Sequence, residues 1–229
     1  MIVNDKIDNI FQQMESANTK VIKETSYLGG SSRQEIINHN STKKIFKTGI
    51  DGKTTEIDYE EIGATGEIEV LNYYINIFLA YSSEDKKKGI DEIYEVIKSK
   101  IGNDSLLKYK ENCISVIEDN EKLQKSLIPF FYITMHYKFS SFDLIGYKDS
   151  KPILVEVKTT HSENNNNFFI SIAEVNIATG NIDYEIVRVT PSSIHFIGNP
   201  IKMVEDKITA IKADTFSLIP RNYEFNARN

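Results

Sequence analysis

The segment from Ser140 to Thr160 reads SSFDLIGYKDSKPILVEVKTT, and its pattern predicts two short strands joined by a hairpin. The second strand carries Glu156 and Lys158 two positions apart. Side chains of successive strand residues point to opposite faces, so these two side chains lie on the same face. Asp143 belongs to the neighbouring strand. Two carboxylates and one ammonium group therefore meet in a small site for a divalent cation and an activated water, which is what a metal-dependent nuclease needs.

Hydrolysis of a phosphodiester requires charge stabilisation, an aligned water and neutralisation of the leaving oxygen. Mg²⁺ takes oxygen ligands and keeps several of its waters, so two protein carboxylates suffice. We expect Asp143 and Glu156 to be these ligands, with the backbone carbonyl of Val157 as a third and Mn²⁺ as a substitute ion. Lys158 is expected to contact the scissile phosphate or the attacking water, and its charge limits repulsion between the carboxylates. Glu67, at the start of a predicted helix, is a fourth catalytic candidate.

An alternative interpretation of the same residues is purely structural. Asp, Glu and Lys are common in this chain, and the spacing D-x12-E-x-K arises easily by chance. Glu156 and Lys158 would then form an ion pair on the solvated face of a hairpin, where such a pair contributes little to stability. The run ILVEV at 153–157 is too apolar for an exposed edge strand, however, and the helix that carries Glu67 precedes the strands in the order that this kind of active site uses. Both points favour the catalytic interpretation.

Composition describes an ordinary soluble globular protein, with 40% hydrophobic and 26% charged residues in a chain of 229. The single cysteine, Cys113, excludes an internal disulfide and fits a reducing compartment. The N-terminus lacks the features of a signal peptide, and the longest apolar run, 128–135, is too short to span a bilayer. We therefore expect a cytoplasmic protein that has no contact with membranes.

The net charge of −6 is spread along the chain, without a basic block. This distribution argues against strong non-specific affinity for DNA, which comes from neutralising phosphates. It does not exclude a nuclease, because acidic sites that take up a metal ion are common in such enzymes. It does keep a second class of function open, a non-catalytic module with a nuclease fold that binds DNA or protein.

Helical patterns dominate the first part of the chain. Apolar spacing predicts a helix over 3–24 and a second one over 65–81, which Thr65 caps. A charged helical zone covers about 86–126 and is divided near Gly102. Between the first two helices, the segment IFKTGIDGKTTEIDYEEI suggests a hairpin.

Strand patterns dominate the remainder, and strands are predicted over 130–137, 142–147, 153–159, 168–170 and 184–189. Ser171 and Glu174 fit a capping box, S-x-x-E, at the start of a short helix, so we interpret Glu174 as a capping partner rather than a catalyst. Residues 201–208 suggest a last strand or helix. Together these elements predict an α/β fold with one mixed sheet and helices on its faces.

Five short motifs within residues 61–190 share one order with a known group of nucleases. They read GATGE at 63–67, FD at 142–143, EVKTT at 156–160, FFISIAE at 168–174 and YEIVRV at 184–189. The set resembles the PD-(D/E)XK nuclease superfamily, and more narrowly its Mrr-like branch and the NO VEIN C-terminal-type domain.

The resemblance implies a restriction-endonuclease-like fold, with a central mixed β-sheet flanked by helices. The nuclease domain would cover 61–229 with a helical insertion at about 82–127, and residues 1–60 would be an N-terminal extension or small module. Asp143, Glu156 and Lys158 would form the catalytic triad, with Glu67 as an accessory acid.

The same resemblance implies Mg²⁺ as cofactor and DNA as substrate. Cleavage of a duplex by this superfamily usually needs two active sites, so a homodimer is expected. The implied role is DNA restriction or defence, and a repair or recombination nuclease is the enzymatic alternative. The chain has no G-x-x-x-x-G-K-[ST] motif, so a motor or methyltransferase partner would be a separate polypeptide.

Overall fold

The computed structural model describes residues 2–16, 20–24, 44–48, 54–101, 106–137, 140–160, 163, 168, 170–180 and 183–199. The elements before the main sheet hairpin are α1 (Ile2–Ser16), β1 (Val21–Glu24), β2 (Lys44–Thr48), β3 (Thr54–Asp58), α2 (Tyr59–Leu79), α3 (Ser83–Ile101), α4 (Leu107–Ser115) and α5 (Asn120–Phe131). The elements that follow are η2 (Ile133–Met135), β4 (Leu144–Lys148), β5 (Lys151–Thr159), α6 (Ile172–Ala178), β6 (Tyr184–Val189) and β7 (Ser193–Gly198).

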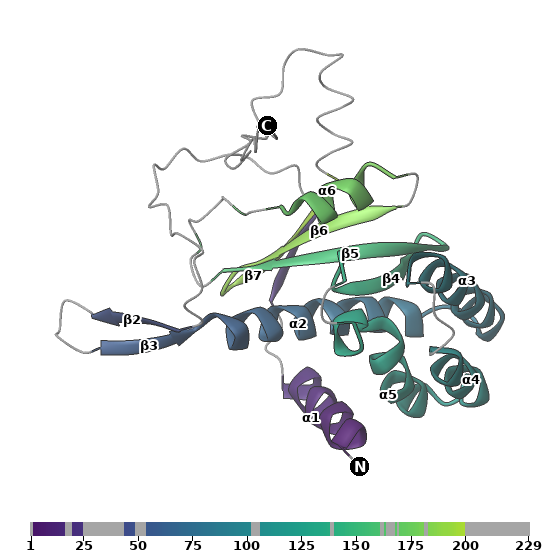
Figure 1. The fold of residues 1–229 in the computed structure, drawn as a ribbon. Coiled ribbons are helices and arrows are strands. Elements are labelled where there is room, and N and C mark those ends of the chain that lie inside the picture. The colour runs from purple at the N-terminus through teal and green to yellow at the C-terminus, as the bar shows by residue number, and fades with distance from the viewer. Residues whose placement is uncertain are drawn as a thin grey trace.

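A mixed sheet of five strands, in the order β1-β7-β6-β5-β4, forms the centre of the protein (Figure 1). β5 pairs with β4 in antiparallel and with β6 in parallel orientation. β7 is antiparallel to β6 and parallel to β1. The strand that carries Glu156 and Lys158 is therefore paired on both sides. β2 and β3 form the predicted hairpin, which is separate from this sheet.

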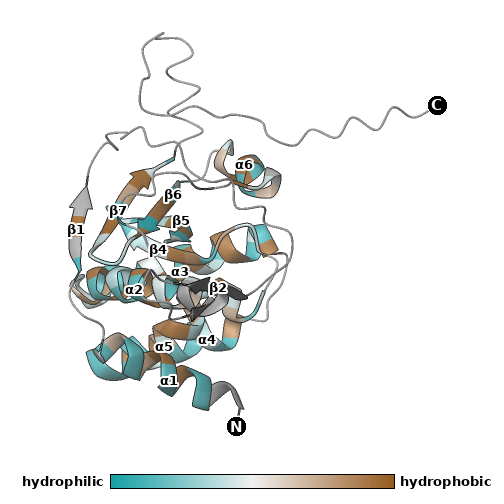
Figure 2. Ribbon diagram, turned by 90° about the vertical axis from the view of Figure 1, so that its left-hand side faces the viewer, coloured by the Kyte–Doolittle hydropathy of each residue, from teal (hydrophilic) through white to brown (hydrophobic). Residues whose placement is uncertain are grey.

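Helices cover both faces of the sheet, as the sequence predicts. α2 and α3 pack on one face against β4 and β5, and α5 packs on the outer side of α2 together with α1 and α4. α6 lies on the opposite face, beside β6 (Figure 1). Figure 2 shows hydrophobic segments in the strands and in α5, whereas α1 is largely hydrophilic. The protein has an α/β fold that is compatible with the restriction-endonuclease-like architecture.

The contact between α2 and the sheet requires a glycine. Tyr74 of α2 lies against Gly146 of β4, and a Cβ atom at position 146 would lie 2.3 Å from Cδ1 of the tyrosine ring. The Tyr74 hydroxyl continues across the sheet and donates a hydrogen bond to Glu185 of β6. One aromatic side chain thus joins the helix to β4 and β6, because β4 offers no side chain at the crossing point.

The hairpin between β4 and β5 is confirmed. Lys148 pairs with Lys151, which leaves Asp149 and Ser150 as a loop of two residues. Both loop residues have positive φ, 52° and 59°. Tight hairpins favour such turns because their twist matches that of the strands. The hairpin fixes which β4 residue stands opposite which β5 residue, and so brings Asp143 beside the end of β5.

The strand predicted over 130–137 is wrong. α5 continues through Pro129 to Phe131, and a 3-10 turn, η2, follows at Ile133–Met135. The aromatic and β-branched residues of this segment are common in strands, but here they are buried among helices and sheet. Tertiary packing has overridden the local preference.

The helix predicted over 3–24 is too long, because α1 ends at Ser16 and residues 21–24 form β1, which pairs with β7. α2 begins at Tyr59, so Thr65 lies inside the helix and does not cap it. α1 contacts α5 and α2, so segments from the first 60 residues pack on the rest of the fold.

β7 was not predicted, and neither Phe168 nor Ile170 belongs to a strand. The element suggested at 201–208 lies outside the described residues. Within the described segments, no helix has the combination of length and apolar character that crossing a membrane requires.

The two glycines Gly146 and Gly63 give a matched test of the helix–sheet contact. Gly146→Ala is expected to lower the free energy of unfolding by about 1–3 kcal/mol, because the new methyl group collides with Tyr74. Gly63 lies in α2 with nothing within 4 Å of a Cβ atom. Gly63→Ala should therefore leave stability unchanged or raise it by up to about 1 kcal/mol. Urea denaturation measures both, and a neutral Gly146→Ala would contradict the packing described.

Candidate active site

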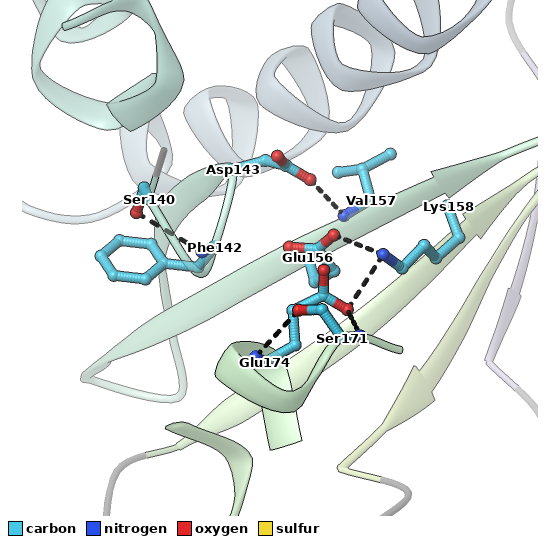
Figure 3. Close-up of polar contacts among 8 residues, drawn as sticks. All are labelled: Ser140, Phe142, Asp143, Glu156, Val157, Lys158, Ser171 and Glu174. Carbon is cyan, nitrogen blue, oxygen red and sulfur yellow. Dashed lines mark hydrogen bonds and ion pairs between the residues drawn. The ribbon is translucent and has the colours of Figure 1, made fainter. Parts of the chain in front are cut away.

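Asp143 is fixed immediately before β4 by two backbone groups of β5. Its Oδ2 accepts a hydrogen bond of 2.8 Å from the N–H of Val157 (Figure 3). Its own N–H donates to the carbonyl of Val155 at 2.9 Å. These contacts continue the β4–β5 ladder by one residue and hold the Asp143 carboxylate at the edge of β5.

Glu156 and Lys158 lie on one face of β5, as their spacing predicts. Lys158 Nζ donates to Glu156 Oε1 at 2.6 Å (Figure 3). Glu156 is only 7% exposed, and the Lys158 side chain is 19% exposed. The ion pair of the alternative interpretation is present, but it does not lie on a solvated surface, because Glu156 is buried, Lys158 is half-buried and their strand has neighbours on both sides.

A third charged group, Glu174 of α6, completes this cluster. Its Oε2 lies 3.1 Å from Lys158 Nζ, so the lysine is held between two carboxylates. The predicted capping box is also confirmed, since Glu174 accepts from the N–H of Ser171 at 3.0 Å and Ser171 Oγ accepts from the N–H of Glu174 at 3.2 Å. The box turns the Glu174 side chain back over the start of α6 and toward β5.

Glu67 lies on α2 and is held by two hydroxyl groups. Tyr132 Oη donates to its Oε2 at 2.6 Å, and Thr134 Oγ1 donates to the same oxygen at 3.3 Å. Gly66 lets the helix lie against the end of β5, because a Cβ atom there would be 2.0 Å from Oγ1 of Thr159. This close approach sets Glu67 on the side of β5 opposite Glu174.

The segment of Tyr132 to Thr134 also positions Asp143. The N–H groups of Ile133 and Thr134 donate to the Asp143 carbonyl at 3.0 and 3.2 Å. One short turn therefore binds the side chain of Glu67 and the backbone of Asp143, so that these two acids act on each other electrostatically.

Burial raises the pKa of Asp143 well above its ordinary value, and the charges of Glu156 and Glu67 raise it further. The hydrogen bond from Val157 opposes this rise without cancelling it. Burial likewise raises the pKa of Glu67, against the hydrogen bonds of Tyr132 and Thr134 that lower it. Each carboxylate is thus less favourable as an anion here than in water.

The pKa values of Glu156 and Lys158 are shifted by the same burial and the same neighbouring charges. Burial raises the pKa of Glu156 to about 7, and Glu174 adds to this effect although Lys158 opposes it. Burial lowers the pKa of Lys158, but Glu156 and Glu174 outweigh burial and raise it. The ammonium group of Lys158 contacts Glu156 and Glu174, and it opposes the rise of the Asp143 pKa without cancelling it.

The donor set suits Mg²⁺ better than a metal that needs a closed protein cage. Within the described residues, no group of three His, Cys, Asp or Glu side chains is assembled to hold a metal ion. Mg²⁺ retains several waters and needs one or two carboxylates, whereas structural zinc and Ca²⁺ require more protein ligands. A divalent cation stabilises the ionised form of carboxylates whose pKa is raised by burial.

Sequence reasoning named four of the charged residues, Asp143, Glu156, Lys158 and Glu67, and missed the groups that hold them. Glu174 was interpreted as a cap alone, yet the capping geometry itself indicates that its side chain points back past the helix start. Tyr132 and Thr134 gave no signal, because the segment was predicted as a strand. Tyr184 was also missed as a neighbour of the site, although the charges of Glu156, Glu174 and Asp143 act on it.

The raised pKa of Glu156 predicts how stability depends on pH. A carboxyl group with a folded-state pKa of about 7 stabilises the fold while it is protonated, so this stability is present below about pH 4.3 and lost as the pH rises through 7. Without metal, wild type should lose on the order of 3 kcal/mol between pH 4.5 and pH 8 relative to Glu156→Gln, which cannot ionise. Urea denaturation in a chelator at both pH values measures this difference. A constant or rising difference would contradict the burial of Glu156.

Comparison with known proteins gives one match that covers this site. Residues 131–195 match the model of the family described as Protein NO VEIN, C-terminal. No curated protein and no solved structure matches the chain significantly. The matched stretch contains Asp143, Glu156, Lys158 and Glu174, and it runs from the end of α5 into β7. In this stretch, the chain is similar to the NO VEIN C-terminal family.

Proposed function

We propose that this protein is an Mg²⁺-dependent DNA endonuclease of the PD-(D/E)XK type, with Asp143, Glu156, Lys158 and Glu67 as its catalytic residues. The observation that carries the proposal is the placement of Asp143, Glu156 and Lys158 at the β4–β5 edge, with Glu156 buried and Asp143 and Lys158 half-buried. The family match over 131–195 and the α/β fold support it. Such charges on a paired strand are costly for stability alone, which favours a catalytic purpose.

Asp143, Glu156 and the carbonyl of Val157 would hold the cation. The N–H of Val157 points to the β4 side, where it meets Asp143. The C=O of a strand residue points to the same side as its N–H, so the Val157 carbonyl also faces this edge. When bound, Mg²⁺ would supply positive charge for the phosphate and acidify a nucleophilic water. Mn²⁺ is expected to replace it.

Lys158 would leave the two carboxylates and donate to the scissile phosphate or to the attacking water. Its raised pKa keeps it protonated at neutral pH. Glu67 would accept hydrogen bonds from water at the other side of the site, held in place by the hydroxyl of Tyr132. In this arrangement, Glu156 would hold the cation in place of the ammonium group, and Lys158 would be available to the phosphate.

The expected substrate is double-stranded DNA, and restriction or defence is the expected role. Cleavage of both strands needs two sites, so a homodimer is proposed, with any motor or methyltransferase as a separate polypeptide. Light scattering coupled to gel filtration should give twice the mass of 26.2 kDa under cleaving conditions. Cleavage of both strands by a strict monomer would contradict the proposed homodimer, but it would not contradict the proposed catalytic residues.

Cleavage assays on plain and modified DNA with Mg²⁺ or Mn²⁺ test the catalytic role. Lys158→Ala and Asp143→Asn should each lower the rate by about 10²-fold or more, since each removes charge that acts on the reacting phosphate or holds the cation. Asn retains an oxygen that can accept from Val157, so Asp143→Asn preserves the local hydrogen bond. The matched control is Lys151→Ala on the same strand. Lys151 forms a 3.0 Å ion pair with Asp183 at half-exposed positions, and its loss should leave the rate unchanged.

Two results would overturn the proposal. Cleavage that survives both Lys158→Ala and Asp143→Asn would place the chemistry elsewhere. Absence of Mg²⁺ and Mn²⁺ binding at millimolar concentrations by calorimetry, with DNA present, would instead favour the non-catalytic binding module.

A further inference from the structure

The hydroxyl of Tyr184 lacks a hydrogen-bond partner although it is buried. Tyr184 is 4% exposed, and its Oη is shielded from solvent without any bond to a described residue. A buried hydroxyl without a partner costs about 1–3 kcal/mol, so such groups are rare in stable folds. A phenylalanine would fill the same volume without this penalty.

Other buried tyrosines of this protein have found carboxylate partners. Tyr74 donates to Glu185, and Tyr147 donates to Glu92 at 2.9 Å. Tyr132 donates to Glu67 at the candidate site. The hydroxyl of Tyr184 therefore differs from the hydroxyls of these three tyrosines, which suggests that its partner arrives in another state of the protein.

Tyr184 lies next to the charged cluster. It stands opposite Leu154 on the parallel strand β5, with Ile186 opposite Glu156. Leu154 and Glu156 share one face of β5, so Tyr184 and Glu156 are diagonal neighbours on this face, within the reach of an aromatic side chain. Burial raises the pKa of Tyr184, and among charged groups Glu156 adds most to this rise, ahead of Glu174 and Asp143.

We propose that Tyr184 is a positioning residue, whose hydroxyl donates to the Glu156 carboxylate when a divalent cation is bound. In the structure, Lys158 supplies the hydrogen bond to Glu156. Glu156 and Asp143 would together hold the cation, and Lys158 would then be available to the phosphate. The Tyr184 hydroxyl would replace the lost donor and fix the orientation of Glu156 as a ligand. This inference rests on the proposed function and adds a residue to it.

Calorimetric titration with Mn²⁺ alone, on wild type and Tyr184→Phe, tests this role. Tyr184→Phe should weaken the Kd for Mn²⁺ about tenfold or more, as is typical when a group that orients a metal ligand is lost. Its metal-free thermal midpoint should stay equal to that of wild type or rise, because the hydroxyl has no bond to lose there. The matched control is Tyr147→Phe, which removes the bond to Glu92. It should lower the midpoint and leave the Kd for Mn²⁺ unchanged.

The outcomes separate the two proposals. An unchanged Kd in Tyr184→Phe overturns the positioning role while leaving the nuclease proposal in place. A marked fall of its metal-free midpoint also overturns the role, since the hydroxyl would then have a structural partner without metal. If wild type binds no Mn²⁺, the proposed function fails and the role of Tyr184 fails with it.

Discussion

Charges on a strand that is paired on both sides must be neutralised within the protein, and this constraint organises the fold around β5. Glu156 and Lys158 lie on the face covered by α6, and the opposite face of the same strand packs on α2. The cluster is stabilised by bonds that Lys158 makes to Glu156 and Glu174. Removing one member of such a group leaves its partner buried and unpaired, which costs more than the pair contributes.

The site is consequently a balance of opposed charges. Two acids, Glu156 and Glu174, hold the ammonium group of Lys158, and burial raises the pKa of Glu67, Asp143 and Glu156. The structure accommodates them with fixed donors: the N–H of Val157, the hydroxyl of Tyr132 and the start of α6. A divalent cation would compensate the remaining negative charge of the acids and leave Lys158 available to the substrate. Hydrogen-bond donors and charges that are fixed before the reaction can stabilise the charge of a transition state without a cost of reorganisation.

Parts of the fold and of the candidate site could be predicted from the local sequence. The two-residue period of ILVEVK placed Glu156 and Lys158 on one face, and S-x-x-E predicted the start of α6, because both patterns depend on neighbours in the chain. The contacts of Lys158 with Glu174, and of Tyr132 with Glu67, join segments that local patterns do not connect. The segment 130–137 was misjudged for the same reason. Its residues favour a strand, but α5 extends to Phe131 and a 3-10 turn follows at Ile133–Met135, next to β4. β1 was missed because its partner β7 lies more than 160 residues away in the chain, which leaves no local signal. β7 pairs with β6 across a short turn, and this local hairpin was overlooked.

We propose that Asp143 and Glu156 share one cation at the β4–β5 edge. The anomalous scattering of Mn²⁺ in crystals grown with that ion would locate the cation. We expect one strong peak within roughly 2.5 Å of a carboxylate oxygen of each residue and of the Val157 carbonyl, with Lys158 turned away from Glu156. A peak elsewhere, or a Glu156–Lys158–Glu174 cluster unchanged at saturating Mn²⁺, would contradict it.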